Sequence, residues 1–483
     1  MLSLLLLALA GLYTPANWQV FPSLDEIRCI SSTGSEVYVA VPAGVCVLDR
    51  PRYNLVRTLN QADGITGEVR LCAHNPARGD VYITTDGHIY RFVPATGRVE
   101  ELTAPFEWVS SIGIAKDGAF FETDAGLFFR ARNPVEFTPV SELPDDLIWY
   151  GARDTLVPRD FPFLTPYFVM DEQLLTHQIT RVWPDRDNRR LFAVAQGYGI
   201  LVYNTRSGFS ETHIRFGPSR AAVQRIAPLD GRLWFIGGST AVGLDSAGDW
   251  HYILTRPGDL ATGNFRLLFG NVTNLKRSEG LNALLPDSAG LLLGTDYGIY
   301  LLGSNRELVQ TLSLPRRING LLRVNDGLLF GTDQGLFLAG GDSVVEYSDP
   351  YGATDWGVFD IVRSTNGTAW FGVLGGIVSR TPDGRWFQYV PPGFDLKQPV
   401  SAIAAAGTRV FMATPSLPGP SPLAPRPSSV ITVFDTKDNS WTTIDAARGL
   451  PVSQITSLFA DDRFLWLASP GLIARLDYTK ELR

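Results

Sequence analysis

Aromatic and charged side chains are concentrated in one irregular segment of the chain, residues 145–178, which reads DDLIWYGARDTLVPRDFPFLTPYFVMDEQLLTHQ. Aromatic rings beside arginine and aspartate can stack on a sugar or enclose a partner's side chain, while the charged groups hydrogen-bond to it. The alternative is a loop that packs its own aromatic rings against the domain. The candidate binding residues of this segment are Trp149, Tyr150, Arg153, Asp154, Arg159, Asp160, Phe163 and Tyr167.

Residue types that perform catalysis or bind metals are present, but their spacing matches no known motif. The five histidines are scattered, and neither HExxH, GxSxG nor a phosphate-binding loop occurs. The three cysteines lack metal-ligand spacing and are expected to be small buried side chains. We therefore predict no catalytic residue, no metal site and no cofactor. Four turn aspartates recur at one repeat position and could bind a cation on a common rim, or cap their own turns: Asp86, Asp124, Asp296 and Asp333.

These residues must be positioned by a repeated element. Residues 290–302 read GLLLGTDYGIYLL and residues 327–339 read GLLFGTDQGLFLA. Each such unit begins with two apolar residues three positions apart, then a turn, a five-residue apolar run, a second turn and further short strands. The unit starts are Ile27/Ile30, Val69/Cys72, Val109/Ile112, Ile179/Val182, Val223/Ile226, Leu281/Leu284, Ile318/Leu321, Val358/Ile361, Val400/Ile403 and Val452/Ile455.

Four short strands in a period of about 40–45 residues are typical of a β-propeller blade. One small sheet cannot bury both its faces, so blades stack on their neighbours. Glycine in a run such as LLFGT allows close approach between blades. We therefore predict an all-β fold, a β-propeller of four-stranded blades over residues 17–483 with about ten repeats. We expect one closed ring in which the N-terminal strand, NWQVFP at 17–22, completes the last blade; the alternative is two smaller propellers.

The repeat resembles the propeller repeats of bacterial two-component regulator sensors, best over residues 281–302, 318–339, 358–379 and 452–474. The resemblance implies a periplasmic propeller that senses a ligand, often a saccharide. Members of that family carry a membrane helix and a kinase after the propeller. This chain contains neither, so what the resemblance implies is an exported propeller with a binding face, without a direct signalling role.

The N-terminus and the overall charge bear on location and partners. The start MLSLLLLALAGLY has a short apolar run and an Ala8-Leu9-Ala10 cleavage pattern, so residues 1–12 are a predicted signal peptide. It lacks a preceding Lys or Arg, and a buried strand or uncleaved anchor is the alternative. No later stretch reaches about 18 apolar residues, so no membrane-spanning segment is expected in the mature protein. The net charge of −7 without a basic cluster argues against nucleic acid.

Function is expected in the insertions between repeats, namely 145–178, 255–280 and the Pro-rich 415–429, which we predict to be a hairpin tip. The leading hypothesis is an exported, non-catalytic propeller, in the periplasm or outside the cell. It would bind a glycan or protein as a sensor-like or scaffold module. The alternative is a propeller enzyme, a polysaccharide lyase or hydrolase, which would need carboxylates that meet across the ring. A purely structural component of the cell envelope is a third possibility.

Overall fold

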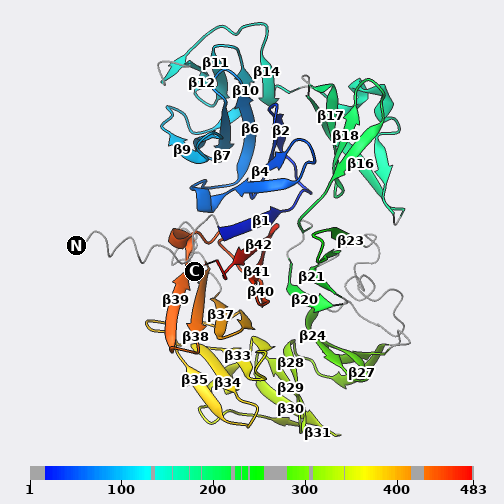
Figure 1. Cartoon of the computed structure of the whole chain (residues 1–483), viewed down its shortest axis with the longest axis vertical. Coiled ribbons are helices and arrows are strands. Elements are labelled where there is room, and N and C mark those ends of the chain that lie inside the picture. The colour runs from blue at the N-terminus through cyan, green and yellow to red at the C-terminus, as the bar shows by residue number, and fades with distance from the viewer. Residues whose placement is uncertain are drawn as a thin grey trace, which may run out of the picture. The chain divides into compact units, whose positions relative to one another are not determined.

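The structure is a computed structural model of the whole chain, and its strands form antiparallel sheets of four or five strands (Figure 1). The predicted signal peptide and nearly all of the insertions 255–280 and 415–429 lie outside the described residues. The structure describes residues 17–131, 136–154, 156–172, 174–185, 188–218, 223–229, 231–237, 240–254, 280–303, 308–341, 343–414 and 429–480.

Contacts divide the chain into two compact units. The four-sheet unit comprises Gln19–Arg220, and the six-sheet unit comprises Met1–Trp18 with Ala221–Arg483. Strand β1 (Trp18–Pro22) begins at the boundary and forms the edge of the last sheet, in the order β1-β42-β41-β40. This sheet confirms the prediction that the N-terminal strand completes the last blade.

The four-sheet unit contains two four-stranded and two five-stranded sheets among its described residues. The first sheet is β2 (Cys29–Ser32), β3 (Glu36–Val41), β4 (Gly44–Asp49) and β5 (Leu55–Leu59), and the second is β6 (Val69–Asn75), β7 (Asp80–Thr85), β8 (Ile89–Val93) and β9 (Arg98–Leu102). The third sheet has the order β13 (Phe137–Pro139), β12 (Gly126–Ala131), β11 (Gly118–Thr123), β10 (Val109–Ile114), β14 (Ile148–Gly151). The fourth has the order β15 (Phe168–Met170), β16 (Thr176–Asp185), β17 (Arg190–Ala195), β18 (Gly199–Asn204), β19 (Ser210–Ile214).

The six-sheet unit repeats a simpler four-stranded pattern. Its sheets are β20 (Arg225–Leu229), β21 (Arg232–Gly237), β22 (Thr240–Leu244), β23 (Trp250–Leu254); β24 (Leu281–Asp287), β25 (Gly290–Thr295), β26 (Gly298–Leu302), β27 (Leu308–Ser313); β28 (Ile318–Val324), β29 (Gly327–Thr332), β30 (Gly335–Gly340), β31 (Ser343–Glu346); β32 (Asp360–Arg363), β33 (Ala369–Val373), β34 (Gly376–Arg380), β35 (Trp386–Tyr389); β36 (Ala402–Ala406), β37 (Arg409–Thr414), β38 (Val430–Asp435), β39 (Ser440–Ile444); and β1 with β40 (Ser457–Ala460), β41 (Phe464–Ser469), β42 (Leu472–Asp477). Short 3-10 helices are η2 (Gln61–Asp63), η3 (Pro158–Asp160), η4 (Pro162–Leu164), η7 (Ala353–Trp356) and η8 (Ala446–Arg448).

The first strands of the six-sheet unit are neighbours all the way round, from β20 through β24, β28, β32 and β36 to β40, which lies against β20 again (Figure 1). The Ile226 backbone N–H closes the circle by donating to the Ser457 hydroxyl at 3.1 Å. Because these six sheets complete a ring by themselves, the expected single ring of ten is not formed. The all-β propeller prediction is confirmed, and its arrangement is the alternative, two smaller units.

Sheet packing explains several features of the repeat. A Cβ added at Gly331 would lie 2.7 Å from Cγ1 of Val358 on the approach to the next sheet, and one at Gly294 would lie 2.8 Å from Cγ2 of Ile318. The glycines in LLLGT and LLFGT therefore permit close packing between neighbouring sheets, as predicted.

The strands that flank the Pro-rich insertion, β37 and β38, pair with Thr414 opposite Val430, as expected for a hairpin. In the last unit, the apolar step is Ile455/Leu458 rather than Val452/Ile455, because Ser457 pairs with Ala468.

In the four-sheet unit, β2 lies against β6 and β16, and β6 lies against β10. One continuous apolar cluster joins the first three sheets, and all three cysteines are buried. The first and fourth sheets meet at Tyr53 and Phe192, whose ring centroids are 6.1 Å apart. A face of the fourth sheet is covered by Phe161, Phe163 and Tyr167 from the insertion.

Candidate functional site

A polar residue stands at the start of the first strand in several sheets, directly after the repeated apolar residue. In five sheets this residue is an extra one, because the pairing with the second strand shifts there as a β-bulge. A bulge redirects its side chain and is often found where a sheet edge carries a site. The five bulge residues are Arg70, Ser110, Thr180, Asn282 and Asn319.

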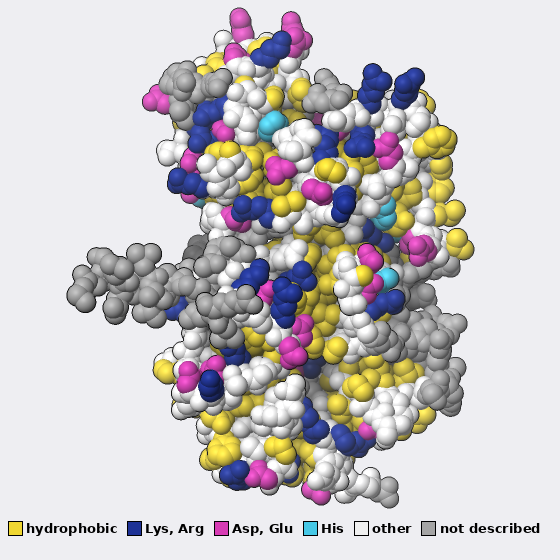
Figure 2. Space-filling view, in the orientation of Figure 1, with side chains coloured by type: hydrophobic (Ala, Val, Ile, Leu, Met, Phe, Trp, Pro, Cys, Tyr) yellow, Lys and Arg dark blue, Asp and Glu magenta, His cyan; other side chains and the backbone are white. Residues whose placement is uncertain are grey.

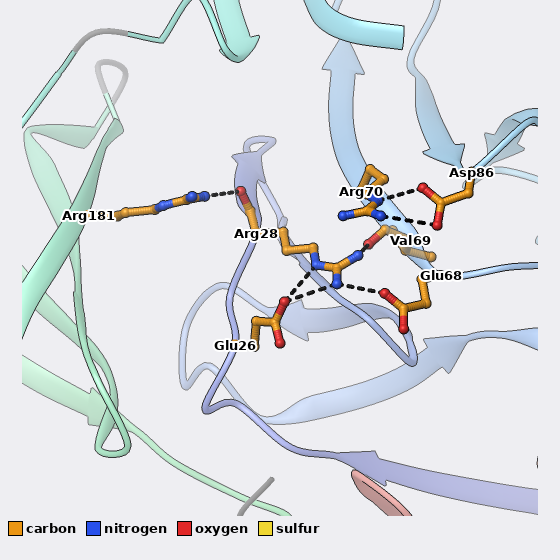
Figure 3. Close-up of polar contacts among 7 residues, drawn as sticks. All are labelled: Glu26, Arg28, Glu68, Val69, Arg70, Asp86 and Arg181. Carbon is orange, nitrogen blue, oxygen red and sulfur yellow. Dashed lines mark hydrogen bonds and ion pairs between the residues drawn. The ribbon is translucent and has the colours of Figure 1, made fainter. Parts of the chain in front are cut away.

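Arg28 occupies the equivalent position before β2 and links three sheets of the four-sheet unit (Figure 3). Its Nη2 donates to Glu26 at 2.9 Å and to Glu68 at 2.7 Å, and its Nη1 donates to the Val69 carbonyl at 2.9 Å. Its own main-chain carbonyl accepts a hydrogen bond from Nη1 of Arg181 at 3.1 Å. The Arg28 side chain is only 14% exposed, so it stabilises this end of the unit.

Arg70 and Asp86 form a two-point ion pair beside this network (Figure 3). Nε of Arg70 donates to one Asp86 oxygen at 2.6 Å, and Nη2 donates to the other at 3.1 Å. The hydrogen bonds from Arg70 hold the pKa of Asp86 below its usual value, and the pKa of Arg70 is raised by the same partner. Both side chains are nearly half exposed, so the pair is available to solvent.

Glu122 and Arg153 form a second pair on the third sheet. Nη2 of Arg153 donates to Glu122 at 2.6 Å, and the Ser110 hydroxyl donates to the other Glu122 oxygen at 3.2 Å. The Arg153 guanidinium lies 4.9 Å from the ring centroid of Trp149. Arg153 lowers the pKa of Glu122, so this carboxylate also stays anionic.

We call these side chains the charged end of the four-sheet unit. It holds as many arginines as carboxylates, and every carboxylate in it bonds to a guanidinium. A general acid needs a raised pKa, so this arrangement suits binding better than proton transfer. The charged end consists of Glu26, Arg28, Glu68, Arg70, Asp86, Glu122, Arg153 and Arg181.

Half of the residues singled out in the sequence belong to the third sheet. Trp149 and Tyr150 lie in β14, which pairs with β10, so they are part of a strand rather than a free loop. The Tyr150 hydroxyl accepts a hydrogen bond from Ser31 at 3.3 Å, and burial raises its pKa. The Asp154 backbone N–H donates to the Gly151 carbonyl at 3.0 Å in the following turn. Of this group, Arg153 belongs to the charged end, and Trp149 lies against its guanidinium.

The other half packs on the fourth sheet. Arg159 and Asp160 lie in η3, where an Asp160 oxygen accepts the Val157 N–H at 2.9 Å. The Phe163 ring lies 6.0 Å from that of Tyr203, and Tyr167 joins the same apolar cluster. The predicted site is thus divided between two sheets. A binding role for its eight residues stays a prediction.

Sequence reasoning missed Arg28, Arg70 and Arg181, which the structure brings to one end of the four-sheet unit. The available signal was an arginine within the apolar step itself, in Ile27-Arg28 and Val69-Arg70. The turn aspartates are divided between the two units: Asp86 and Asp124 belong to the four-sheet unit, and Asp296 and Asp333 to the six-sheet unit. Asp124 accepts a hydrogen bond from the Trp108 backbone N–H, and Asp296 accepts one from the Gly280 backbone N–H. In the described part of the chain, no cluster of three or more His, Cys, Asp or Glu side chains could hold a metal ion.

The centre of the six-sheet unit is linked by a different ion pair. Nη2 of Arg225 lies 2.7 Å from an oxygen of Asp360, whose side chain is 4% exposed. The second Asp360 oxygen accepts the Ile403 N–H at 3.0 Å, and Arg225 also donates to the Asn319 carbonyl at 3.4 Å. The pair connects the inner strands of several sheets, so we assign it a role in stabilising the fold.

The surface carries both signs of charge. On the face shown in Figure 2, Lys/Arg and Asp/Glu side chains are interspersed, with no extended basic area. Among the described residues, none of the helices has the length and hydropathy needed to cross a bilayer.

Comparison with known proteins finds similarity in structure alone, since neither a family model nor a curated protein matches the sequence. The fold is similar to PorZ, described as an essential bacterial surface component of the type-IX secretion system of Porphyromonas gingivalis, with 10% identity over 95% of this chain and 87% of that one, and a TM-score of 0.52. Weaker similarity is found to the extracellular domain of the two component system BT4673 from B. thetaiotaomicron (11% identity, 94% and 70% coverage, TM-score 0.38). Virginiamycin B lyase from Staphylococcus aureus is comparably distant (12% identity, 64% and 93% coverage, TM-score 0.36). At these identities the likeness concerns the fold.

Proposed function

We propose that this chain is an exported, non-catalytic propeller module that binds a glycan or a protein through the charged end of the four-sheet unit. The observation that carries the proposal is the pairing of each carboxylate there with a guanidinium, which keeps Asp86 and Glu122 anionic. Paired guanidinium and carboxylate groups offer fixed donors and acceptors to a polar ligand without supplying an acid catalyst. A role at the cell surface is supported by the fold shared with PorZ.

Several donors of the charged end are free to meet such a ligand. Arg70 uses Nε and Nη2 for Asp86, so its Nη1 points to no protein acceptor among the described residues. Arg181 is exposed, and among the described residues its side chain donates one hydrogen bond, to the Arg28 carbonyl. Trp149 supplies an aromatic face next to Arg153. A sugar hydroxyl or a partner's carboxylate would accept hydrogen bonds from the N–H groups that these arginines leave unused.

The test is binding of the purified full chain to a glycan array and to an envelope-protein extract, followed by variants. We expect Arg70→Ala and Arg181→Ala to weaken capture of the identified ligand at least tenfold. The control is Arg385→Ala, which removes an exposed ion pair with Asp383 in the six-sheet unit. Binding that is insensitive to both variants would place the ligand elsewhere. Release of unsaturated sugar products, followed by ultraviolet absorbance, would instead favour a lyase.

A further inference from the structure

Arg130 of β12 is a buried charge without a carboxylate partner. The residue is 3% exposed, and within the described ranges its guanidinium forms no ion pair and no well-aligned hydrogen bond. An arginine stays protonated in proteins, so it carries its charge into this site. Burying an unpaired charge is costly, and a neutral water would leave that charge uncompensated. An anionic ligand would relieve this cost.

The surroundings of Arg130 add positive charge. Burial lowers the pKa of its guanidinium, and the charges of Arg78 and Arg91 from the second sheet lower it further. The Tyr82 hydroxyl also lies near it, itself without a well-aligned hydrogen bond. The ring centroid of Phe137 lies 5.0 Å from the guanidinium carbon of Arg130. Three guanidinium groups are therefore gathered where the second and third sheets pack together.

The carboxylates beside these arginines are already engaged. One oxygen of Asp80 lies 3.1 Å from Nε of Arg78 and 3.7 Å from Nε of Arg91. Glu100 accepts a hydrogen bond from Nη2 of Arg91 at 2.8 Å. Three guanidinium groups are thus matched by two carboxylates, and the remaining positive charge is that of Arg130. The arginine cluster, as we call it, consists of Arg78, Asp80, Tyr82, Arg91 and Arg130.

The arginine cluster is accessible to a small group only. Nε of Arg130 is fully enclosed, but Nη1 and Nη2 are not, so the tip of the side chain reaches solvent. The side chains of Arg78 and Arg91 are 13% and 18% exposed, and they add N–H donors beside this tip. Planar guanidinium groups match the oxygens of sulfate and phosphate, which accept several charge-assisted hydrogen bonds. A tetrahedral oxyanion therefore suits both the charge and the narrow opening.

We propose that the arginine cluster binds a small free oxyanion, sulfate or inorganic phosphate, through Nη1 and Nη2 of Arg130. Arg78 and Arg91 add positive charge around the anion. This site goes beyond the proposed function and does not depend on it, because Asp80 begins β7 and Asp86 of the charged end follows the other end of that strand. The two sites share no residue.

The test is calorimetric titration of the full chain with sodium sulfate and sodium phosphate at constant ionic strength. We expect both anions to bind the wild type, and Arg130→Met to weaken binding at least about tenfold, as expected for the loss of charge-assisted hydrogen bonds. Sulfate should also raise the thermal midpoint of the wild type, because a ligand stabilises the folded state that binds it. Without either anion, Arg130→Met should be at least as stable as the wild type, since an apolar chain replaces a buried charge.

The matched control variant is Arg475→Met in the six-sheet unit. Burial also lowers the pKa of Arg475, but its guanidinium packs against Phe464 and Trp466, with ring centroids at 4.6 Å and 5.2 Å. This variant should keep the wild-type affinity for sulfate, which separates specific binding from the general stabilisation of proteins by sulfate. Phenyl phosphate tests the source of the oxyanion and should not bind, because its ring exceeds the opening at a residue that is 3% exposed.

An equal response to sulfate in the wild type and in Arg130→Met would overturn the proposal. So would a wild type that binds neither anion, or an Arg130→Met variant that is less stable than the wild type without them, which would assign Arg130 a structural role. Binding of phenyl phosphate as tight as that of phosphate would overturn the assignment to a free anion, in favour of a phosphate group on a larger ligand.

Discussion

The same repeat position carries different chemistry in the two units. In the four-sheet unit, the bulge residue Arg70 bonds to the turn residue Asp86 as an exposed ion pair. In the six-sheet unit, the equivalent bulge residue Asn282 bonds to the equivalent turn residue Asp296 at 2.8 Å. A neutral amide therefore satisfies the same geometry, so the fold does not require the charge of Arg70. Charges that the scaffold does not need are the ones to test for binding.

A second repeat position also carries different residue types in the two units. The residue before the end of the second strand is Gly294 or Gly331 in the six-sheet unit, whereas Thr84 occupies it in the second sheet of the four-sheet unit. The glycines touch the next sheet so closely that a methyl group would not fit. These two sheets of the six-sheet unit thus depend on tight packing against their neighbours, whereas the second sheet of the four-sheet unit accommodates a larger side chain. The position varies within each unit, since Ile236 occupies it in β21 and Ala40 in β3.

The largest effect is expected from the buried pair of the six-sheet unit. Asp360→Ala leaves Arg225 without its carboxylate and the Ile403 N–H without its acceptor. Removing one partner of a buried ion pair typically costs about 3–5 kcal/mol. Urea denaturation, followed by tryptophan fluorescence, measures the loss. Arg385→Ala on the surface is the control, and an equal loss in both variants would contradict a central role for Asp360.

Gly331→Ala should be next in size. The new Cβ would meet Val358 at 2.7 Å, and overpacking of this kind costs about 1–3 kcal/mol. Gly34→Ala is the matched control in the four-sheet unit, because nothing lies within 4 Å of a Cβ there. The free energy of unfolding of the two variants is compared. A neutral Gly331→Ala would show that the sheets of this ring can separate without penalty.

Arg28→Met tests the link between sheets in the four-sheet unit. It keeps the apolar stem but removes the bonds to Glu26, Glu68 and the Val69 carbonyl. We expect a loss of about 1–2 kcal/mol, because these are charge-assisted bonds at a partly solvated site. The loss should shrink in high salt. An unchanged unfolding midpoint in urea would show that the network follows the fold rather than supporting it.

The turn threonines give a direct comparison between the units. Thr332→Val removes the hydrogen bond to the Gly335 carbonyl and should cost about 1 kcal/mol. Thr85→Val removes a hydroxyl without a partner and should be neutral or slightly stabilising. Thermal unfolding of both variants measures the difference. If both lose the same amount, the Thr85 hydroxyl has an acceptor in solution.

The smallest effect is expected from Asp86→Asn, since the Arg70–Asp86 pair is exposed and contributes about 0.5 kcal/mol or less. The pKa of Asp86 is depressed in the folded protein, so its contribution is present above the ordinary value near 4 and is lost as the pH falls through the folded value. The wild type and variant should therefore differ at pH 7 and converge in acid. A difference that grows in acid would reverse the assigned sign.

Much of the scaffold could be predicted because its signals are local. The apolar step recurs in every sheet, the glycine in LLFGT recurs in several, and the strand at Trp18 completes the last sheet. Less of the candidate site could be predicted from the sequence. Trp149 and Arg153 were found as a cluster in the chain, but Arg28, Arg70 and Arg181 lie far apart in sequence and meet only when their sheets pack.

The sequence by itself determined that this protein is built of small repeated sheets, because each unit buries its apolar run in the same way. Only the tertiary structure decided that the last six sheets close a ring of their own, since closure depends on which sheet faces β40 and not on any single repeat. It also decided where charge accumulates. Residues at equivalent ends of separate sheets become neighbours only through packing. No local sequence pattern specifies how far apart these residues lie in the folded protein.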